Sequence, residues 1–159
     1  MIDIVVDADA GSGMVFEPPE GIDAAVKNAC AIAGYEAPEP TLCIRFTANV
    51  EIRALNHQWR NKDAVTDVLS FPMQEAPFDL DESLGDIALA VPFARQEADR
   101  LHVPVDAHIL HLIIHASLHL LGFDHINDDE ADRMQGLESE TMQRMGLHNP
   151  YSFEARVQS

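Results

Sequence analysis

The sequence predicts an α+β fold, in which a mixed four-stranded sheet is packed with about five helices. Three observations support it. The 159 residues suit one domain with one hydrophobic core, so we expect residues 1–159 to form a single domain. Four short segments have the composition or alternation of strands, and segments with helical periodicity gather mostly toward the C-terminal end. The composition, 47% hydrophobic and 23% charged, is that of an ordinary globular protein.

The N-terminal part contains two predicted strands, each followed by a helix. Residues 1–7 are β-branched and partly alternating, which predicts a half-buried strand. Apolar residues then recur at helical spacing from 22 to 33, and Gly34 can end that helix. Residues 41–47 alternate as a second strand, and we expect Asn49 to cap the next helix, which carries Ile52, Leu55 and Trp59.

The remaining chain predicts two more strands and three more helices. Residues 66–71, bounded by Pro72, and residues 86–90, after Gly85, have the character of strands. The acidic segment 75–83 between them is expected to be an exposed loop. The predicted helices run from Pro92 to about Leu101, from Val105 to Leu121, where Gly122 stops the helix, and from Asp128 to about Met145.

The charge of the chain limits how it could bind nucleic acid. Its formal charge is −17, from 10 basic against 27 acidic residues, which argues against binding phosphates by bulk electrostatics. Any such contact must be local, in the middle of the chain, unless the basic residues there are only solvated surface charges. Six of the ten lie between positions 45 and 100: Arg45, Arg53, Arg60, Lys62, Arg95 and Arg100.

Nothing in the sequence predicts a disulfide framework or a membrane segment. Cys30 and Cys43 lack the close spacing of a redox or zinc motif and are interpreted as core thiols. There is no stretch of about 18 apolar residues, and the first residues carry acid where a signal peptide would carry base. A cytoplasmic location is therefore expected.

Four of the eight histidines lie within residues 111–125, and three of them have the spacing of a metal site. His115 and His119 are four residues apart, so a helix places both on one face. Gly122 lets the chain turn back and bring His125 to the same ion. We therefore predict a metal site of His115, His119 and His125 at the end of the central helix. The alternative for the helical pair alone is two hydrogen-bonded core side chains.

Three neutral imidazoles leave a fourth position of a tetrahedral zinc ion open, which is typical of catalytic sites. Zinc lowers the pKa of water to about 7, so hydrolysis is the chemistry this set favours. One Zn²⁺ ion is the expected cofactor, although nickel or copper would also bind such ligands. His111 is interpreted either as a partner that orients a ligand or as a buried histidine. His148 is interpreted as a surface residue, and Met134 and Met142 as core residues.

The order H-x-x-x-H-x-x-G-x-x-H is also the spacing of metzincin proteases, so a metallopeptidase is the first rival hypothesis. Those proteases have a glutamate directly after the first histidine as general base, whereas this chain has Ala116. The general base is left open. Asp124 is one candidate, with a role in orienting a ligand or capping the turn as its alternative.

Three motifs together resemble the YbeY endoribonuclease family. Residues 115–125, HASLHLLGFDH, look like the family signature HGxLHLxGYDH. Residues 60–72, RNKDAVTDVLSFP, are similar to R-x-K-D-x-P-T-D-V-L-S-F-P, and residues 84–87 match L-G-D-I. The chain departs from the pattern at Ala116, in place of glycine, and at Val65, in place of proline. We expect the Ala116 methyl group to narrow the space beside the metal.

The resemblance implies a zinc-dependent, single-strand-specific endoribonuclease that acts in ribosomal RNA maturation, at the 3′ end of the small-subunit RNA, and in ribosome quality control. It implies the same three histidines as ligands and Arg60 as a functional residue. Arg60 and His115 are thus the catalytic candidates, with the Arg60 guanidinium expected to bind a phosphate. The expected partners are ribosomal RNA, the small ribosomal subunit and ribosome-associated proteins, with neither DNA nor a membrane. A non-catalytic ribosome-assembly factor with structural zinc is the second rival hypothesis.

Overall fold

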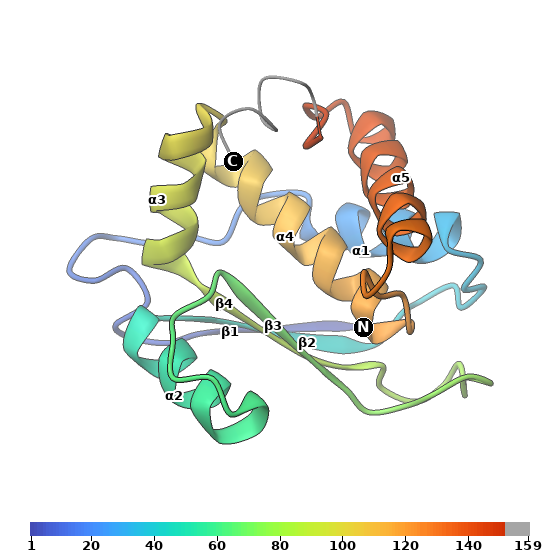
Figure 1. Cartoon of the computed structure of the whole chain (residues 1–159), viewed down its shortest axis with the longest axis horizontal. Coiled ribbons are helices and arrows are strands. Elements are labelled where there is room, and N and C mark those ends of the chain that lie inside the picture. Colours follow the sequence, from blue (N-terminus) through green and yellow to red (C-terminus); the bar gives the residue numbers. More distant parts are fainter. Residues whose placement is uncertain (152–159) are drawn as a thin grey trace.

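The computed structural model describes residues 1–151, which form an α+β arrangement of four strands and five helices (Figure 1). The predicted fold class is confirmed, and the element bounds agree with the predicted segments within a few residues. The elements are β1 (Ile2–Val6), α1 (Ile22–Ile32), β2 (Leu42–Thr47), α2 (Asn49–Arg60), β3 (Val68–Pro72), β4 (Gly85–Ala90), α3 (Val91–Leu101), α4 (Val105–Leu120) and α5 (Asp128–Arg144).

The sheet is mixed, with strand order β1-β2-β4-β3. β1 pairs with β2 and β2 with β4 in parallel, whereas β3 runs antiparallel to β4. β1 and β3 are therefore the two edges. Strand β1 is less buried than expected, because an edge strand has a neighbour on one side only; Ile4, Val5 and Val6 are all exposed.

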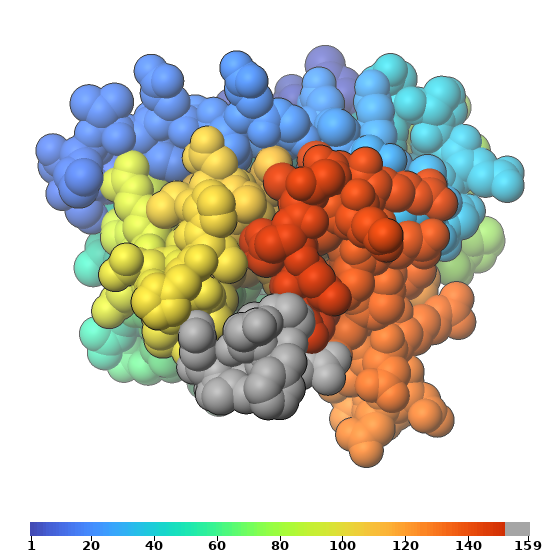
Figure 2. Space-filling view, turned by 90° about the horizontal axis from the view of Figure 1, so that it is seen from above, coloured from blue at the N-terminus to red at the C-terminus, as the bar shows by residue number. Residues whose placement is uncertain are grey.

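Four helices cover one face of the sheet and enclose the main core. Leu42, Ile44 and Phe46 alternate along β2 and belong to this core, to which α1 and α4 also contribute buried side chains. Figure 1 shows α4 crossing the sheet, with α1, α3 and α5 around it, and Figure 2 shows α3 in yellow and α5 in red over this helical face. Most of α4 is buried, which explains why its apolar residues occur all around the helix.

Among residues 1–151, α2 is the element that covers the other face of the sheet. Ile52 of α2 packs with Leu69, Ala88 and Ala90 of β3 and β4 in a second, smaller cluster. Beyond α2 this face stays open over β1 and β2, where Val5 is 47% exposed. The sheet thus separates a thick helical layer, which carries the histidines, from a thin layer made by one helix.

Two helix starts differ in how their backbone N–H groups are satisfied. Asn49 does not cap α2 as expected, because Ala48 occupies the cap position. Asn49 Oδ1 instead accepts a hydrogen bond from the Phe93 N–H in the first turn of α3, at 3.0 Å. Asn127 caps α5 through the Glu130 N–H, at 2.9 Å. The side chain that caps α3 thus comes from another element, a long-range contact that local sequence does not encode.

Several smaller predictions can be compared with the structure. The loop 75–83 is mostly exposed, as expected. Cys30 is buried, but Cys43 is only partly so. Among the described residues no single helix is long and apolar enough to cross a membrane; α3 and α4 pass such a test only as a pair, and they are bent by 113° at their junction.

Candidate metal centre

The last turns of α4 carry His115 and His119 side by side. Both are partly buried, and their ring centroids are 4.5 Å apart. One nitrogen from each of them and one from His125 all lie within 4.8 Å of one another. The structure thus brings together the three histidines that the spacing predicted, in an arrangement able to hold a metal ion.

His125 reaches this position because the chain reverses directly after α4. Gly122 adopts a φ of 96°, a conformation that side chains rarely allow, and the following loop returns along the helix end. Asp124 Oδ1 accepts the His125 backbone N–H at 2.8 Å, which fixes the turn. This contact fits the interpretation of Asp124 as a turn-capping residue.

Hydrogen bonds at the outer nitrogens determine which nitrogens are available to a metal. His119 Nδ1 lies 2.9 Å from the Phe123 carbonyl oxygen, which can only accept, so Nδ1 carries the proton. His115 Nδ1 lies 3.0 Å from Glu138 Oε1 and donates in the same way. When both rings are neutral, Nε2 is therefore the atom with a free lone pair in each, turned toward the other histidine.

These two Nε2 atoms are 3.0 Å apart. Burial, and then the neighbouring His115, lower the pKa of His119 to about 4, so this ring is uncharged near neutral pH. Two lone pairs at this distance repel unless a cation lies between them. Tetrahedral zinc, with Zn–N distances of about 2.0–2.1 Å, separates two ligand nitrogens by roughly 3.3 Å, so the donor set fits such an ion.

Glu138 of α5 supports the site, and its role was not predicted from the sequence. It is 1% exposed. Its Oε1 accepts from His115 and from His111 Nε2, at 2.8 Å, while its Oε2 accepts from the Tyr151 hydroxyl, at 2.9 Å. Burial alone would raise the pKa of Glu138, but the hydrogen bonds from His111 and His115 outweigh it and lower the pKa to about 2.

A signal for Glu138 was present in the sequence. Met134 and Met142, correctly interpreted as core residues, lie on the buried face of α5, and Glu138 lies midway between them, four residues from each. A carboxylate on the apolar face of an amphipathic helix requires a buried partner. The link to His111 supports the interpretation of that residue as a partner that orients a ligand.

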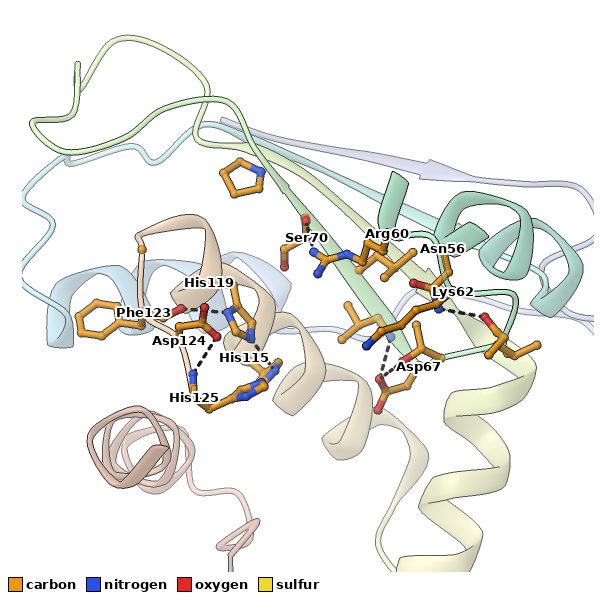
Figure 3. A pocket seen from close by; sticks show the side chains of 17 residues that line it. Asn56, Arg60, Lys62, Asp67, Ser70, His115, His119, Phe123, Asp124 and His125 are labelled. Atoms are coloured by element: carbon orange, nitrogen blue, oxygen red, sulfur yellow. Dashed lines mark hydrogen bonds between the residues drawn. The ribbon is translucent and has the colours of Figure 1, made fainter. Parts of the chain in front are cut away.

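The histidines form one wall of a cleft with a volume of about 700 Å³. Figure 3 shows them on α4 and its following loop, with Arg60 and Lys62 on the opposite wall, from the end of α2 and the loop after it. Arg60 Nη2 donates to the Ser70 carbonyl oxygen of β3 at 2.9 Å, and Ser70 Oγ donates to the Ala116 carbonyl oxygen of α4 at 3.1 Å. Ser70 therefore connects the two walls.

The structure shows which of the six basic residues in the middle of the chain face the cleft. Arg45 pairs with Asp7, Arg53 with Asp63 and Arg100 with Glu97, while Arg95 donates to backbone carbonyls of residues 11 and 15. Only Arg60 and Lys62 line the cleft. Within residues 1–151, Lys62 has no carboxylate partner.

Two further side chains differ from their predicted surroundings. Ala116 does not narrow the space beside the metal, because its side chain is fully buried in the main core and does not line the cleft. Val65, by contrast, does line the cleft. His148 is partly buried, with Nδ1 unpartnered among the described residues, and is not the surface residue that we predicted.

The fold and the three histidines define an α+β protein with a candidate metal site in an open cleft. Residues 18–146 match the family described as YbeY: Endoribonuclease YbeY. The chain therefore belongs to the YbeY family, as the three motifs indicated.

Individual relatives agree with this assignment. A protein named Endoribonuclease YbeY from Sinorhizobium fredii (strain NBRC 101917 / NGR234) is 36% identical, over 99% of this chain and 96% of its own length. One of the same name from Rhizobium meliloti (strain 1021) is 48% identical, over 69% of this chain and 67% of its own. The solution structure of TM1509 from Thermotoga maritima superposes with a TM-score of 0.56 at 21% identity, covering 92% of each chain, and supports the fold.

Proposed function

We propose that this protein is a zinc-dependent endoribonuclease that hydrolyses phosphodiester bonds of single-stranded RNA. The observation that carries the proposal is the composition of the cleft, in which a three-histidine metal site faces two cationic side chains, Arg60 and Lys62. Relatives that match along most of the chain bear the name endoribonuclease. When bound, zinc supplies Lewis acidity, which polarises a phosphoryl oxygen and activates water near neutral pH.

The protein's own residues would position the substrate. Arg60 presents a planar, positively charged guanidinium that matches phosphate geometry. Its bond to the Ser70 carbonyl holds the guanidinium at the cleft wall while other N–H groups remain able to bind a phosphate. Lys62 adds a second cation, so a phosphate between the walls would meet positive charge from one side and the metal ligands His115, His119 and His125 on the other.

The metallopeptidase hypothesis is disfavoured by the β3 edge beside the histidines. Extended peptides commonly bind by adding a strand to such an edge. Backbone hydrogen bonds at both ends of β3 join its odd-numbered residues to β4. The N–H and C=O groups of the even-numbered residues therefore point away from β4, toward the open edge of the sheet. The Val68 N–H is bonded to Asp67 Oδ1, the Ser70 carbonyl to Arg60, and Pro72 has no N–H. The edge is therefore poorly suited to a peptide.

The access of solvent to the three histidines argues against a purely structural zinc site. Structural sites are typically closed by four protein ligands, whereas here three histidines line an open cleft and His125 is exposed. We further propose ribosomal RNA of the small subunit, near its 3′ end, as the substrate, and the cytoplasm as the location, with ribosome-associated proteins as partners. The charge of −17 suits contact with basic ribosomal proteins.

The test is cleavage of single-stranded small-subunit ribosomal RNA by the purified protein, beside a His119→Ala variant purified in the same way. We expect cleavage that chelator abolishes, zinc restores and the variant lacks. Cleavage of unfolded protein instead of RNA would favour the peptidase. Cleavage of neither, with zinc still bound, would favour the assembly factor.

The role of Arg60 has a matched control on the same helix. We expect Arg60→Ala to lower kcat/KM about 10- to 100-fold, because a charged hydrogen bond to phosphate is lost. Arg53→Ala removes an arginine that is exposed and paired with Asp63 outside the cleft, so we expect nearly full activity. Equal rates for the two variants would contradict phosphate binding by Arg60.

A further inference from the structure

Trp59, the single tryptophan of the chain, lies beside the cleft with 64% of its surface exposed. It occupies the last turn of α2, directly before Arg60. Its ring meets the Phe71 ring of β3 nearly edge to face, with centroids 6.5 Å apart and planes at 71°. This contact holds the indole at the open face of the sheet, yet leaves much of the ring in solvent.

Trp59 lines a groove of about 740 Å³ on the face of the sheet that α2 covers incompletely. The floor and sides are mostly apolar, with Val5, Leu55, Phe71 and Ile87 among them. Arg60, Ser70 and Pro72 line both this groove and the metal-bearing cleft. The two hollows are therefore neighbours that meet at Arg60, and a chain bound in the cleft can continue across Arg60 toward Trp59.

We propose that Trp59 is a stacking platform for an unpaired base of the RNA strand that leaves the cleft past Arg60. This inference rests on the proposed function and names how the same site would select its substrate. Every nucleobase has a π-face that can stack on an exposed aromatic ring, without regard to sequence. A base in a duplex is already stacked and paired, so this contact favours single strands.

Charge in the groove is consistent with stacking as the main source of affinity. Arg45 lines the groove, but Asp7 and Glu51 lie beside its guanidinium. Arg60 is the cation at the junction, and Asp86 adds a negative charge. Because these charges nearly cancel, a strand in the groove gains little from phosphate contacts and binds mainly through Trp59.

The single tryptophan permits a direct test that needs no catalysis. A short single-stranded oligoribonucleotide of mixed sequence is titrated into the full-length His119→Ala protein while the Trp59 emission is recorded. We expect saturable quenching by the single strand and little by the same sequence annealed into a duplex. Absence of quenching at saturating RNA would overturn the proposal. A shift of the emission with protein concentration alone would overturn it as well, because a second copy of the protein would then cover Trp59.

Substitutions separate stacking from a general surface effect. We expect Trp59→Ala to weaken binding of labelled RNA about 5- to 100-fold, and Trp59→Phe to restore most of it. Met73→Ala is the matched control, since Met73 is also 64% exposed but lines neither the cleft nor the groove. Equal affinities for Trp59→Ala and Met73→Ala would overturn the proposal, provided that both unfold at the wild-type temperature.

Salt dependence and kinetics add readouts that a merely structural role would not change. In the His119→Ala background, Trp59→Ala should leave the slope of log K against log salt unchanged, whereas loss of one phosphate contact in Lys62→Ala should reduce it by about 0.7. In the active protein, Trp59→Ala should raise KM and spare kcat. Quenching without RNA cleavage by the wild type would refute the proposed function alone, and cleavage that Trp59→Ala leaves unchanged would refute stacking alone.

Discussion

At the scale of single residues, Glu138 shows how the protein positions the candidate metal ligands. One buried carboxylate accepts hydrogen bonds from His111, His115 and the Tyr151 hydroxyl. The bond to His115 fixes the Nδ1–H tautomer and turns Nε2 toward His119. Glu138 thus acts through His115 as a positioning residue on α5, and it makes the metal site depend on how α5 packs against α4.

We expect Glu138→Gln to weaken zinc binding about 10- to 100-fold, because the amide loses the negative charge that increases the basicity of His115. Competition with a chromogenic chelator measures this affinity. Glu140→Gln is the control, since Glu140 lies on the same helix but is exposed and pairs with Arg144. Equal zinc affinity in the two variants would show that His115 does not need the carboxylate.

The three histidines could be predicted from the sequence because their spacing is local. A separation of four residues defines one helix face, and Gly122 marks the turn, so no long-range information was needed. Glu138 is separated by 23 residues from His115, and their meeting depends on α5 docking against α4. Arg60 could be chosen only through the family motif, because an arginine at a helix end is by itself indistinguishable from a surface charge.

At the scale of elements, the turn after α4 determines whether His125 reaches the site. Gly122→Ala would place a side chain at a φ of 96°, which costs roughly 1–2 kcal/mol of stability and displaces the loop. We therefore expect weaker zinc binding together with a lower free energy of unfolding. Urea denaturation and chelator competition on the same preparation measure both.

Gly136→Ala is the control substitution, at a glycine with helical backbone angles. Gly136 lies within α5, where an added methyl group would meet no atom within 4 Å apart from its chain neighbours and the nearby backbone of α5. Gly136→Ala should stabilise the protein by about 0.5–1 kcal/mol and leave zinc affinity unchanged. If Gly122→Ala behaved like Gly136→Ala, the left-handed turn would not be what holds His125 in place.

Element positions were predicted well, but element pairing was not. Apolar periodicity and the glycine and proline boundaries located all four strands and five helices described in residues 1–151. The order β1-β2-β4-β3 depends on contacts between segments about 40 residues apart, such as Ile4 beside Ile44 and Ile44 beside Ile87. Asn49 shows the same limit, since its side chain caps α3 and not its own helix.

At the scale of the whole molecule, buried histidines link stability to pH. Burial, and then the neighbouring His111, lower the pKa of His108 to about 4 from its ordinary value of 6.5. His108 is 5% exposed, and its Nε2 has no partner within the described part of the chain. The unfolded chain therefore binds a proton that the folded chain rejects between pH 6.5 and 4, so folding stability falls as the pH decreases through this window.

We expect the metal-free protein to lose about 1–2 kcal/mol through His108 alone between pH 7 and pH 5. His119, whose pKa is also lowered to about 4, adds a loss of the same sign, which bound zinc should suppress because the ion needs the neutral ring. His108→Phe keeps a ring in the cavity but cannot titrate, so its stability should fall less over the same interval. Urea unfolding at both pH values, with the exposed His57→Gln as control, measures the difference. A wild-type loss no larger than that of His108→Phe would mean that His108 is protonated in the folded protein as readily as in the unfolded chain.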